Sequence, residues 1–400
     1  MRRHQFVRPP GPLGPVAADY ARYLDGLGYR FGSIQQRMAQ FNQLSRWLLS
    51  EGLSAGELDE VVAARFVAWR CGCGRVAWTS PASMRLPLGF LRSIGMVAEC
   101  RREGPFEELL EGYRRYLLDE RGLAGKTIEA QVVWARRFCV EVAGTVVGLA
   151  DLGPAQLSAY MLKVVEGHSA DWAQKAAGAL RSLLRYLHLR AVTESSLVLA
   201  VPKVKRRRPG PQPRAVDGGE MRRLLAGCDR RRGVGRRDYA ILLLLARLGL
   251  RAGEVGSLNL DDIDWRHGEV MVRGKGGRYE RLPLPDEVGR AIASYLQRGR
   301  PRPGDRCRVV FLRARAPWTP LGQAGVQDVV RYACARCGLE AFGPRRLRHS
   351  AATMMHQGGM SLAVVGQVLR HHDIRVTTVY VDVDEAAVAG LARPWPGSGA

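Results

Sequence analysis

The chain has 400 residues, of which 46% are hydrophobic and 25% are charged, as in an ordinary globular protein of two or three domains. Its 61 Lys+Arg residues against 38 Asp+Glu residues give a net charge of +23, which points to a polyanionic partner, nucleic acid before anionic membrane. The longest apolar run, Ala240 to Ala246, is far below the ~20 residues that span a bilayer, so a membrane protein is disfavoured.

The N-terminus, MRRHQFVRPPGPLGP, is basic but carries Pro and Gly where a signal peptide needs an apolar core, so we expect a cytoplasmic location. Eight cysteines are scattered along the chain, which fits a reducing compartment better than a disulfide framework. The only close pairs, Cys71 with Cys73 and Cys334 with Cys337, are far apart in the sequence. A zinc site needs two matched pairs, so no metal is expected.

Two stretches resemble each other and predict tandem all-helical modules at 1–104 and 105–202. Tyr20 and Tyr23 in the first pair with Tyr113 and Tyr116 in the second. Apolar residues at helical spacing then run to a glycine, and a second amphipathic pattern follows. Chance likeness between two ordinary helical hairpins is the alternative explanation.

The glycines of that likeness are Gly28 and Gly122, and shortly after each comes a hydroxyl residue, Ser33 or Thr127. Serine and threonine are favoured N-caps because their oxygen accepts a backbone N–H of the first turn. The pattern therefore predicts that the second helix of each module starts after Ser33 and after Thr127.

The segment 203–216 is predicted to be an extended basic linker, stiffened by proline. The stretch 201–250 holds 14 basic and 4 acidic side chains. A solvated charge run is the plain interpretation. Because the linker lies between two predicted folded units, we favour a strap along a phosphate backbone, made by Lys203, Lys205, Arg206, Arg207 and Arg208.

An α+β domain is predicted at 217–394, followed by a tail at 395–400. Asp217 is expected to open a helix, and a second helix is expected from Asp238 to Leu248. WRHGEVMVRGKGGRYERLPLP alternates apolar and polar residues around glycines, which predicts a small antiparallel sheet. The expected fold class is thus multidomain and mainly α, with helical modules before a domain that contains this sheet.

Candidate reactive residues gather in this last domain. Taken singly, each has a plain structural explanation: Arg251 with Glu254 as a surface ion pair, Lys275 as a turn residue, Arg348 as a structural cation and Tyr380 as a core aromatic. His371 sits in VLRHHDIRVTTVY, nine residues before Tyr380.

Together these residue types match one reaction, the attack of a tyrosine oxygen on a phosphodiester without metal. Two guanidiniums suit the charge that grows on the non-bridging oxygens, and a lysine can protonate the departing 5′ oxygen. A phenol has a pKa of about 10, so it needs cationic neighbours or a base, and a histidine can serve as either.

At these residues the domain resembles the catalytic domain of the tyrosine recombinases, the phage-integrase family. LGLRAGEV resembles the first arginine motif and contributes Arg251, and Lys275 stands at the β-hairpin lysine position, 24 residues later. RRLRHSAAT resembles the second arginine motif and contributes Arg348. VLRHHDIRVTTVY resembles the histidine-to-tyrosine motif, with His371 23 residues after Arg348.

The resemblance covers about 217–394, and 105–202 looks like the family's helical core-binding (SAM-like) domain by pattern and position. Two departures stand out. Arg345 occupies the place of the family's usual histidine, and an arginine can donate charge and hydrogen bonds but cannot act as a base. Arg370 replaces the usual glycine before the third-motif histidine, which adds a cation and puts the local turn in question. His371 fits the spacing better than His372, and His349 is expected to support its helix.

The resemblance implies a site-specific recombinase or integrase of a mobile element that cuts and rejoins DNA through a 3′-phosphotyrosyl intermediate. Neither metal nor ATP nor another cofactor is implied. Double-stranded DNA is the expected partner, with a homotetramer on two DNA sites and a monomer or dimer without DNA. The alternatives are a catalytically silent DNA-binding regulator, with some weight from Arg345, and a type IB topoisomerase, which shares the chemistry.

Overall fold

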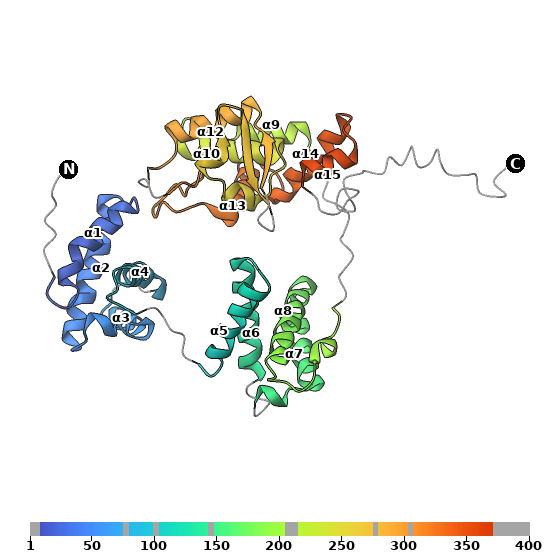
Figure 1. Ribbon diagram of the computed structural model, residues 1–400. Helices are drawn as coiled ribbons and strands as arrows, with labels where there is room; N and C mark the ends of the chain where they lie inside the picture. The colour runs from blue at the N-terminus through green and yellow to red at the C-terminus, as the bar shows by residue number, and fades with distance from the viewer. Residues whose placement is uncertain are drawn as a thin grey trace. The chain divides into compact units, whose positions relative to one another are not determined.

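The computed structural model describes residues 9–74, 80–98, 104–142, 148–204, 215–274, 279–302 and 307–370 (Figure 1). The chain divides into two compact units. One combines Met1–Glu99 with Gln212–Ala400, and the other is Cys100–Pro211. Among the described residues, no helix combines the length and apolar character needed to cross a membrane.

The first part of the chain is all-helical, and its helices pack around aromatic side chains. Tyr20 stacks on Phe41 with ring centroids 4.3 Å apart, and Phe90 closes the cluster at 5.2 Å from Tyr20. Such pairs add specific geometry to the hydrophobic effect. The elements are η1 (Gly14–Val16), α1 (Ala17–Gly26), α2 (Phe31–Ser50), η2 (Ala55–Glu57), α3 (Glu60–Gly72), η3 (Pro81–Met84) and α4 (Arg85–Ser93).

The described residues of the unit Cys100–Pro211 are also helical, with a core of their own. Tyr113 packs against Tyr186 at 5.3 Å, and Phe138 meets Tyr160 edge-on at 5.0 Å. The elements are α5 (Glu107–Arg115), the π-turn η4 (Tyr116–Glu120), α6 (Gly125–Val142), η5 (Leu149–Asp151), α7 (Pro154–Gly167), α8 (Ala170–Leu189) and η6 (Leu197–Ala200).

The tyrosine pairs that suggested a tandem duplication have matching geometry. Tyr20 and Tyr23 stack with centroids 6.3 Å apart and an interplanar angle of 21°. Tyr113 and Tyr116 stack at 6.4 Å and 20°. Tyr20 and Tyr23 both lie on α1, whereas Tyr113 lies on α5 and Tyr116 begins the π-helix η4. The two tyrosine pairs thus have similar geometry, and the tandem duplication stays a prediction.

The predicted starts of the second helices are wrong by a few residues. α2 already begins at Phe31 and α6 at Gly125, so Ser33 and Thr127 lie inside the first turn. The residue before α2, Arg30, makes no side-chain cap. The first N–H groups of a helix lack intrahelical partners wherever it starts, and a hydroxyl cap is one of several ways to satisfy them. A nearby serine therefore does not fix the boundary.

The last described part of the chain begins at residue 215. Asp217 caps the first helix as predicted, because its carboxylate accepts the backbone N–H of Glu220 at 2.8 Å. The elements are α9 (Gly218–Ala226), α10 (Gly233–Arg247), α11 (Ala252–Gly256), η7 (Leu260–Asp262), β1 (Ile263–Asp264), β2 (Glu269–Arg273), β3 (Tyr279–Pro283), α12 (Asp286–Arg298), α13 (Gly322–Arg336), α14 (Pro344–Gln357) and α15 (Leu362–Val368).

Helix α10 is the centre of this part, packed by α9, α11, α12, α13 and α14. The predicted apolar run is its buried core. The helix begins at Gly233, five residues before the predicted start at Asp238. Asp238 is not a cap but a buried carboxylate that pairs with Arg237 at 2.8 Å and Arg336 at 3.7 Å. An acidic residue ahead of an apolar run therefore indicated the wrong boundary, because this carboxylate pairs with its neighbour Arg237 and with the distant Arg336 instead of capping a helix.

The predicted antiparallel sheet is present, in the order β1–β2–β3. Val270 pairs with Leu282, and Val272 pairs with Glu280. Val270, Val272 and Leu282 are buried, so one face covers the core of the domain. The last pair before the turn is Arg273 with Tyr279. The β2–β3 connection, which contains Lys275 in the sequence, therefore joins two paired strands whose inner face is buried.

Candidate active site

Arg251 lies directly before α11 and is held by Glu254, three residues later. The backbone N–H of Arg251 donates to Glu254 Oε2 at 2.8 Å, and its Nη1 donates to Oε1 at 2.7 Å. The Glu254 side chain is only 5% exposed, whereas that of Arg251 is 39% exposed. The pair is therefore no ordinary surface ion pair: a buried carboxylate anchors a guanidinium that solvent, and hence a ligand, can reach.

Arg348 lies on α14 and is buried, with 6% of its surface exposed. Its Nη1 donates to the carbonyl oxygen of Gly249 at 2.6 Å, and its Nη2 donates to the carbonyl oxygen of Leu369. These acceptors lie 99 and 21 residues away in the sequence. Arg348 therefore ties the loop before Arg251 to the end of α15.

The two arginines meet at the turn that follows α15. Arg251 Nη2 donates to the carbonyl oxygen of Arg370 at 3.0 Å, next to the Leu369 carbonyl that accepts from Arg348. Two residues predicted to share one phosphate are thus bound to consecutive carbonyls of one turn. The next residue in the chain is His371.

Gly249 makes this close approach possible. Its φ is +57°, a conformation that favours glycine, and a Cβ at this position would lie 2.5 Å from a side-chain carbon of Leu369. Gly249, the first glycine in LGLRAGEV, therefore brings its carbonyl within reach of Arg348, while the chain turns toward Arg251.

Other predicted site residues have different positions. Arg345 is exposed in the first turn of α14, and the hydrogen bonds described above for the arginine pair do not involve it. His349 is half-buried on the same helix, where its carbonyl accepts the Thr353 hydroxyl at 3.2 Å. Lys203 is exposed after η6. Lys275, His371, Tyr380, Lys205, Arg206, Arg207 and Arg208 lie outside the described residues.

Several other tyrosines are core residues. Burial raises the pKa of Tyr113 to about 12. Burial likewise raises the pKa of Tyr295, whose hydroxyl oxygen accepts the backbone N–H of Leu312 at 3.3 Å. A phenol whose ionised form is destabilised by burial is a poor nucleophile. These two tyrosines therefore do not compete for the reactive role.

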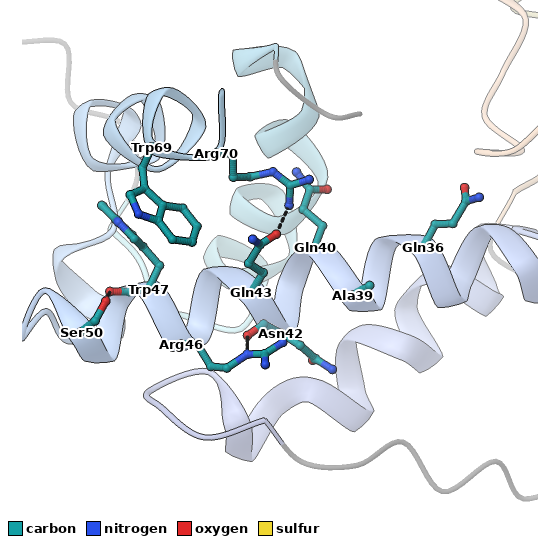
Figure 2. A pocket seen from close by; sticks show the side chains of 10 residues that line it. All are labelled: Gln36, Ala39, Gln40, Asn42, Gln43, Arg46, Trp47, Ser50, Trp69 and Arg70. Carbon is teal, nitrogen blue, oxygen red and sulfur yellow. Dashed lines mark hydrogen bonds between the residues drawn. The ribbon is translucent and has the colours of Figure 1, made fainter. Parts of the chain in front are cut away.

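A polar groove of about 760 Å³ lies on α2 and α3, away from the arginine pair in sequence (Figure 2). Arg70 points across it and donates to the side-chain oxygen of Gln43. Arg46 is exposed on α2, and its Nε donates to the backbone oxygen of Asn42 at 3.3 Å. Amides and guanidiniums are the groups that contact base edges and phosphates. The lining residues are Gln36, Ala39, Gln40, Asn42, Gln43, Arg46, Trp47, Ser50, Trp69 and Arg70.

Neither this groove nor the role of Glu254 was predicted from the sequence. A signal was present for α2, because Gln36, Gln43 and Ser50 recur every seven residues and so share a helix face. Glu254 had a weaker signal: it is the one acidic residue in LGLRAGEVGSL, where Arg251 is the only other charged residue.

Comparison with known proteins gives consistent matches. The model of the phage integrase family matches residues 214–387. A Sinorhizobium fredii protein with the provisional name integrase/recombinase y4rA is 37% identical over 399 residues, which cover 98% of this chain and 96% of that protein. The tyrosine recombinase XerD of Mycobacterium tuberculosis is 33% identical over 306 residues, covering 72% of this chain and 96% of XerD.

Two solved DNA complexes have a similar fold. The XerH site-specific recombinase bound to palindromic difH substrate, in a post-cleavage complex, aligns over 84% of this chain and 96% of its own, with a TM-score of 0.54 and 17% identity. A dimer of lambda integrase fragment 75–356 bound to a COC′ core site aligns over 72% of this chain and 96% of its own, with a TM-score of 0.51 and 17% identity. The expected fold class, mainly helical with a small antiparallel sheet, is confirmed.

Proposed function

Because this chain belongs to the phage integrase family of tyrosine recombinases, we propose that it cuts and rejoins DNA strands through a covalent bond between Tyr380 and a 3′ phosphate. The resemblance seen in the sequence motifs is confirmed, and with it the class of enzyme, a site-specific DNA recombinase. We further propose the catalytic residues, the use of two DNA sites and a homotetrameric assembly.

In the proposed first step the Tyr380 oxygen attacks phosphorus, a new O–P bond forms, and the bond to the 5′ oxygen breaks. The phenol proton goes to a base, for which His371 is the candidate, and Lys275 supplies a proton to the departing 5′ oxygen. Arg251 and Arg348 bind the non-bridging oxygens, where negative charge grows. Arg345, if it reaches the phosphate, adds charge and donors but no base.

In the second step the 5′-hydroxyl oxygen of another strand attacks phosphorus, a new O–P bond forms, and the bond to Tyr380 breaks. The proton of that hydroxyl goes to Lys275, and His371 returns a proton to the tyrosine oxygen, in reversal of the first step. One phosphodiester replaces another, so the energy of the bond is kept, and the scheme uses neither ATP nor metal. The likeness to integrases supports the proposed mobile-element origin. We also propose a cytoplasmic location, where a DNA-processing enzyme would meet its substrate.

One observation carries this proposal: the guanidiniums of Arg251 and Arg348 are fixed to consecutive carbonyls of the turn that leads into His371. An arginine has five N–H donors, so positioning by carbonyl oxygens is compatible with donation to phosphate. Since both groups are held before DNA binds, little reorganisation is needed when charge develops on the phosphate.

A suicide substrate with a nick beside the cleavage site tests the chemistry. Release of the short fragment prevents religation, so the wild-type protein is expected to accumulate as a covalent adduct with a free 5′-hydroxyl, even in excess chelator. Specific binding without any adduct would favour the silent regulator. Relaxation of supercoiled DNA without exchange between sites would favour a type IB topoisomerase, and inhibition by chelator would favour a metal nuclease.

The proposed assembly is a homotetramer on two DNA sites. Four protomers would supply one nucleophile for each of the four strands exchanged. Mass measurement of the trapped complex tests this point. Four protomers with two duplexes support the tetramer, whereas a complex that never exceeds two protomers on one duplex contradicts it.

We propose that the basic linker and the α2–α3 groove hold the duplex. Lys203 marks the described start of the linker, and Arg46 offers an exposed guanidinium at the groove. Substitution of either by alanine is expected to reduce the steepness of the log Kd against log salt plot by about 0.9 for each phosphate that the protein no longer neutralises.

A matched control is Arg331→Ala. Its guanidinium pairs with Asp328 at 2.8 Å on α13, so its charge is already compensated locally. The slope should then be unchanged. Fluorescence anisotropy across a salt series measures all three variants, and a slope that stays at the wild-type value in Lys203→Ala and Arg46→Ala would contradict binding of DNA by these surfaces.

A further inference from the structure

Arg370 combines an unusual backbone conformation with a buried charged side chain. Its φ is +58°, in the left-handed region that long side chains rarely adopt. Its side chain is only 3% exposed. The sequence left open whether the turn expected of a glycine survives with arginine at this position; the turn keeps the left-handed conformation, at the expense of backbone strain.

The buried side chain of Arg370 binds the same carboxylate as Arg251. Arg370 Nη2 donates to Glu254 Oε2 at 2.8 Å, across 116 residues of sequence. Arg251 Nη1 donates to the other oxygen, Oε1, at 2.7 Å. One carboxylate therefore lies between two guanidiniums, of which one is exposed to a ligand and the other is enclosed by the protein.

Arg370 also binds Arg251 directly, because its carbonyl oxygen accepts from Arg251 Nη2 at 3.0 Å. Thus the bonds of Arg251 Nη1 and Nη2 both depend on Arg370, one through Glu254 and the other through the carbonyl. A glycine at position 370 would keep the carbonyl but would not pair with the carboxylate.

The guanidinium of Arg370 changes the net charge of this cluster, and that charge affects the reaction. An isolated buried Arg–Glu pair is neutral, and its carboxylate opposes the attraction of the arginine for a phosphate. With Arg370 present, two guanidiniums and one carboxylate leave one net positive charge. That charge lies on the exposed side, at Arg251, because Arg370 is enclosed and faces Glu254.

We propose that Arg370 is a positioning residue for strand cleavage: by neutralising Glu254 it fixes the guanidinium of Arg251 and leaves its full charge for the scissile phosphate. The inference rests on the proposed function, since it assigns Arg251 to that phosphate. Arg370 does not itself touch the reacting atoms; it acts through Glu254.

The test is single-turnover cleavage of the suicide substrate by the full-length chain. Arg370→Gly suits the left-handed turn and removes the charge, Arg370→Met removes the charge but keeps the length, and Arg370→Lys keeps the charge. Gly and Met are expected to slow cleavage by about tenfold to a hundredfold, the range expected when a reacting group is misplaced by an ångström. Kd for DNA should stay at the wild-type value, and Lys should recover most of the rate.

A double-mutant cycle with Glu254→Gln separates positioning from a general structural role. If Arg370 acts by compensating the Glu254 charge, Arg370→Met should change the cleavage rate by less than about twofold once Glu254 is neutral, the limit within which independent substitutions add. A purely structural side chain would cost the same factor in both backgrounds.

Three results would overturn the inference: wild-type cleavage in Arg370→Gly, an equal decrease in both Glu254 backgrounds, or a decrease confined to DNA affinity. If Arg370→Met fails to fold, the glycine variant, which relieves backbone strain, still shows whether cleavage needs the Arg370 side chain. Absence of an adduct in the wild-type protein would instead refute the proposed function. An adduct that forms at the same rate without the Arg370 side chain would refute only this inference.

Discussion

Tyr380→Phe is expected to abolish the covalent protein–DNA adduct while leaving specific DNA binding unchanged. The substitution removes only the phenolic oxygen, the atom that would bond to phosphorus, and keeps the aromatic ring. Denaturing gel electrophoresis after incubation with the suicide substrate measures the adduct, and anisotropy at fixed salt measures binding.

The matched control is Tyr279→Phe. Tyr279 is 60% exposed on β3, in the same catalytic part, and close in sequence to Lys275. This variant should form the adduct at the wild-type rate. An adduct that persists in Tyr380→Phe and vanishes in Tyr279→Phe would show that the nucleophile was assigned to the wrong tyrosine.

Arg348→Ala is expected to impair both chemistry and stability. Removal of one preorganised donor to a developing oxyanion slows reactions by about a hundredfold to a thousandfold. Arg348 is also buried, and its removal leaves the carbonyls of Gly249 and Leu369 without these donors. Two charge-assisted bonds together correspond to about 3 kcal/mol or more of unfolding free energy. Single-turnover cleavage and urea unfolding measure the two effects separately.

Arg251→Ala provides the contrast. Its side chain is 39% exposed, and after its removal Glu254 still has Arg370 as a partner. Cleavage should fall by a similar factor of about a hundred or more, with a much smaller change in the urea midpoint. If both variants cleaved at the wild-type rate, or if Arg251→Ala were the less stable of the two, the description of this site would be wrong.

The fold was predictable where local sequence decides the structure. Asp217 starts α9 because a carboxylate can cap the N–H of a residue three positions on, and the glycine-centred alternation predicted the hairpin. The predicted helix boundaries were wrong where residues distant in the sequence determine the local structure. Asp238 looked like a helix start, but its partner Arg336 comes from a helix about 100 residues later in the sequence.

Two of the predicted site residues, Arg251 and Arg348, lie close together in the structure. The motifs identified Arg251 and Arg348, and the structure brings them to adjacent carbonyls of one turn. The local sequence does not show that Arg348 and Arg251 donate hydrogen bonds to the carbonyls of residues 369 and 370, because these bonds span up to 119 residues. The sequence likewise does not show that Arg251 and Arg370 share Glu254, because Arg370 lies 116 residues from Glu254. Lys275, His371 and Tyr380 lie outside the described residues, and their roles stay predictions.

The groove on α2 and α3 is a further example. Its amides on α2 repeat at a helical period, which a sequence pattern can show. Arg70 joins them only because α3 packs against α2, 27 residues after its partner Gln43. Charge composition indicated a polyanionic partner, but it could not identify a binding surface, since composition carries no information about which basic side chains share a face.

Peptide mapping of the trapped wild-type complex by mass spectrometry, after nuclease and protease digestion, tests the assignment of Tyr380 most directly. We expect one modified peptide, with a 3′-linked nucleotide attached through phosphate to the oxygen of Tyr380. A nucleotide attached to any other residue, or attached to Tyr380 through a 5′ phosphate, would contradict it.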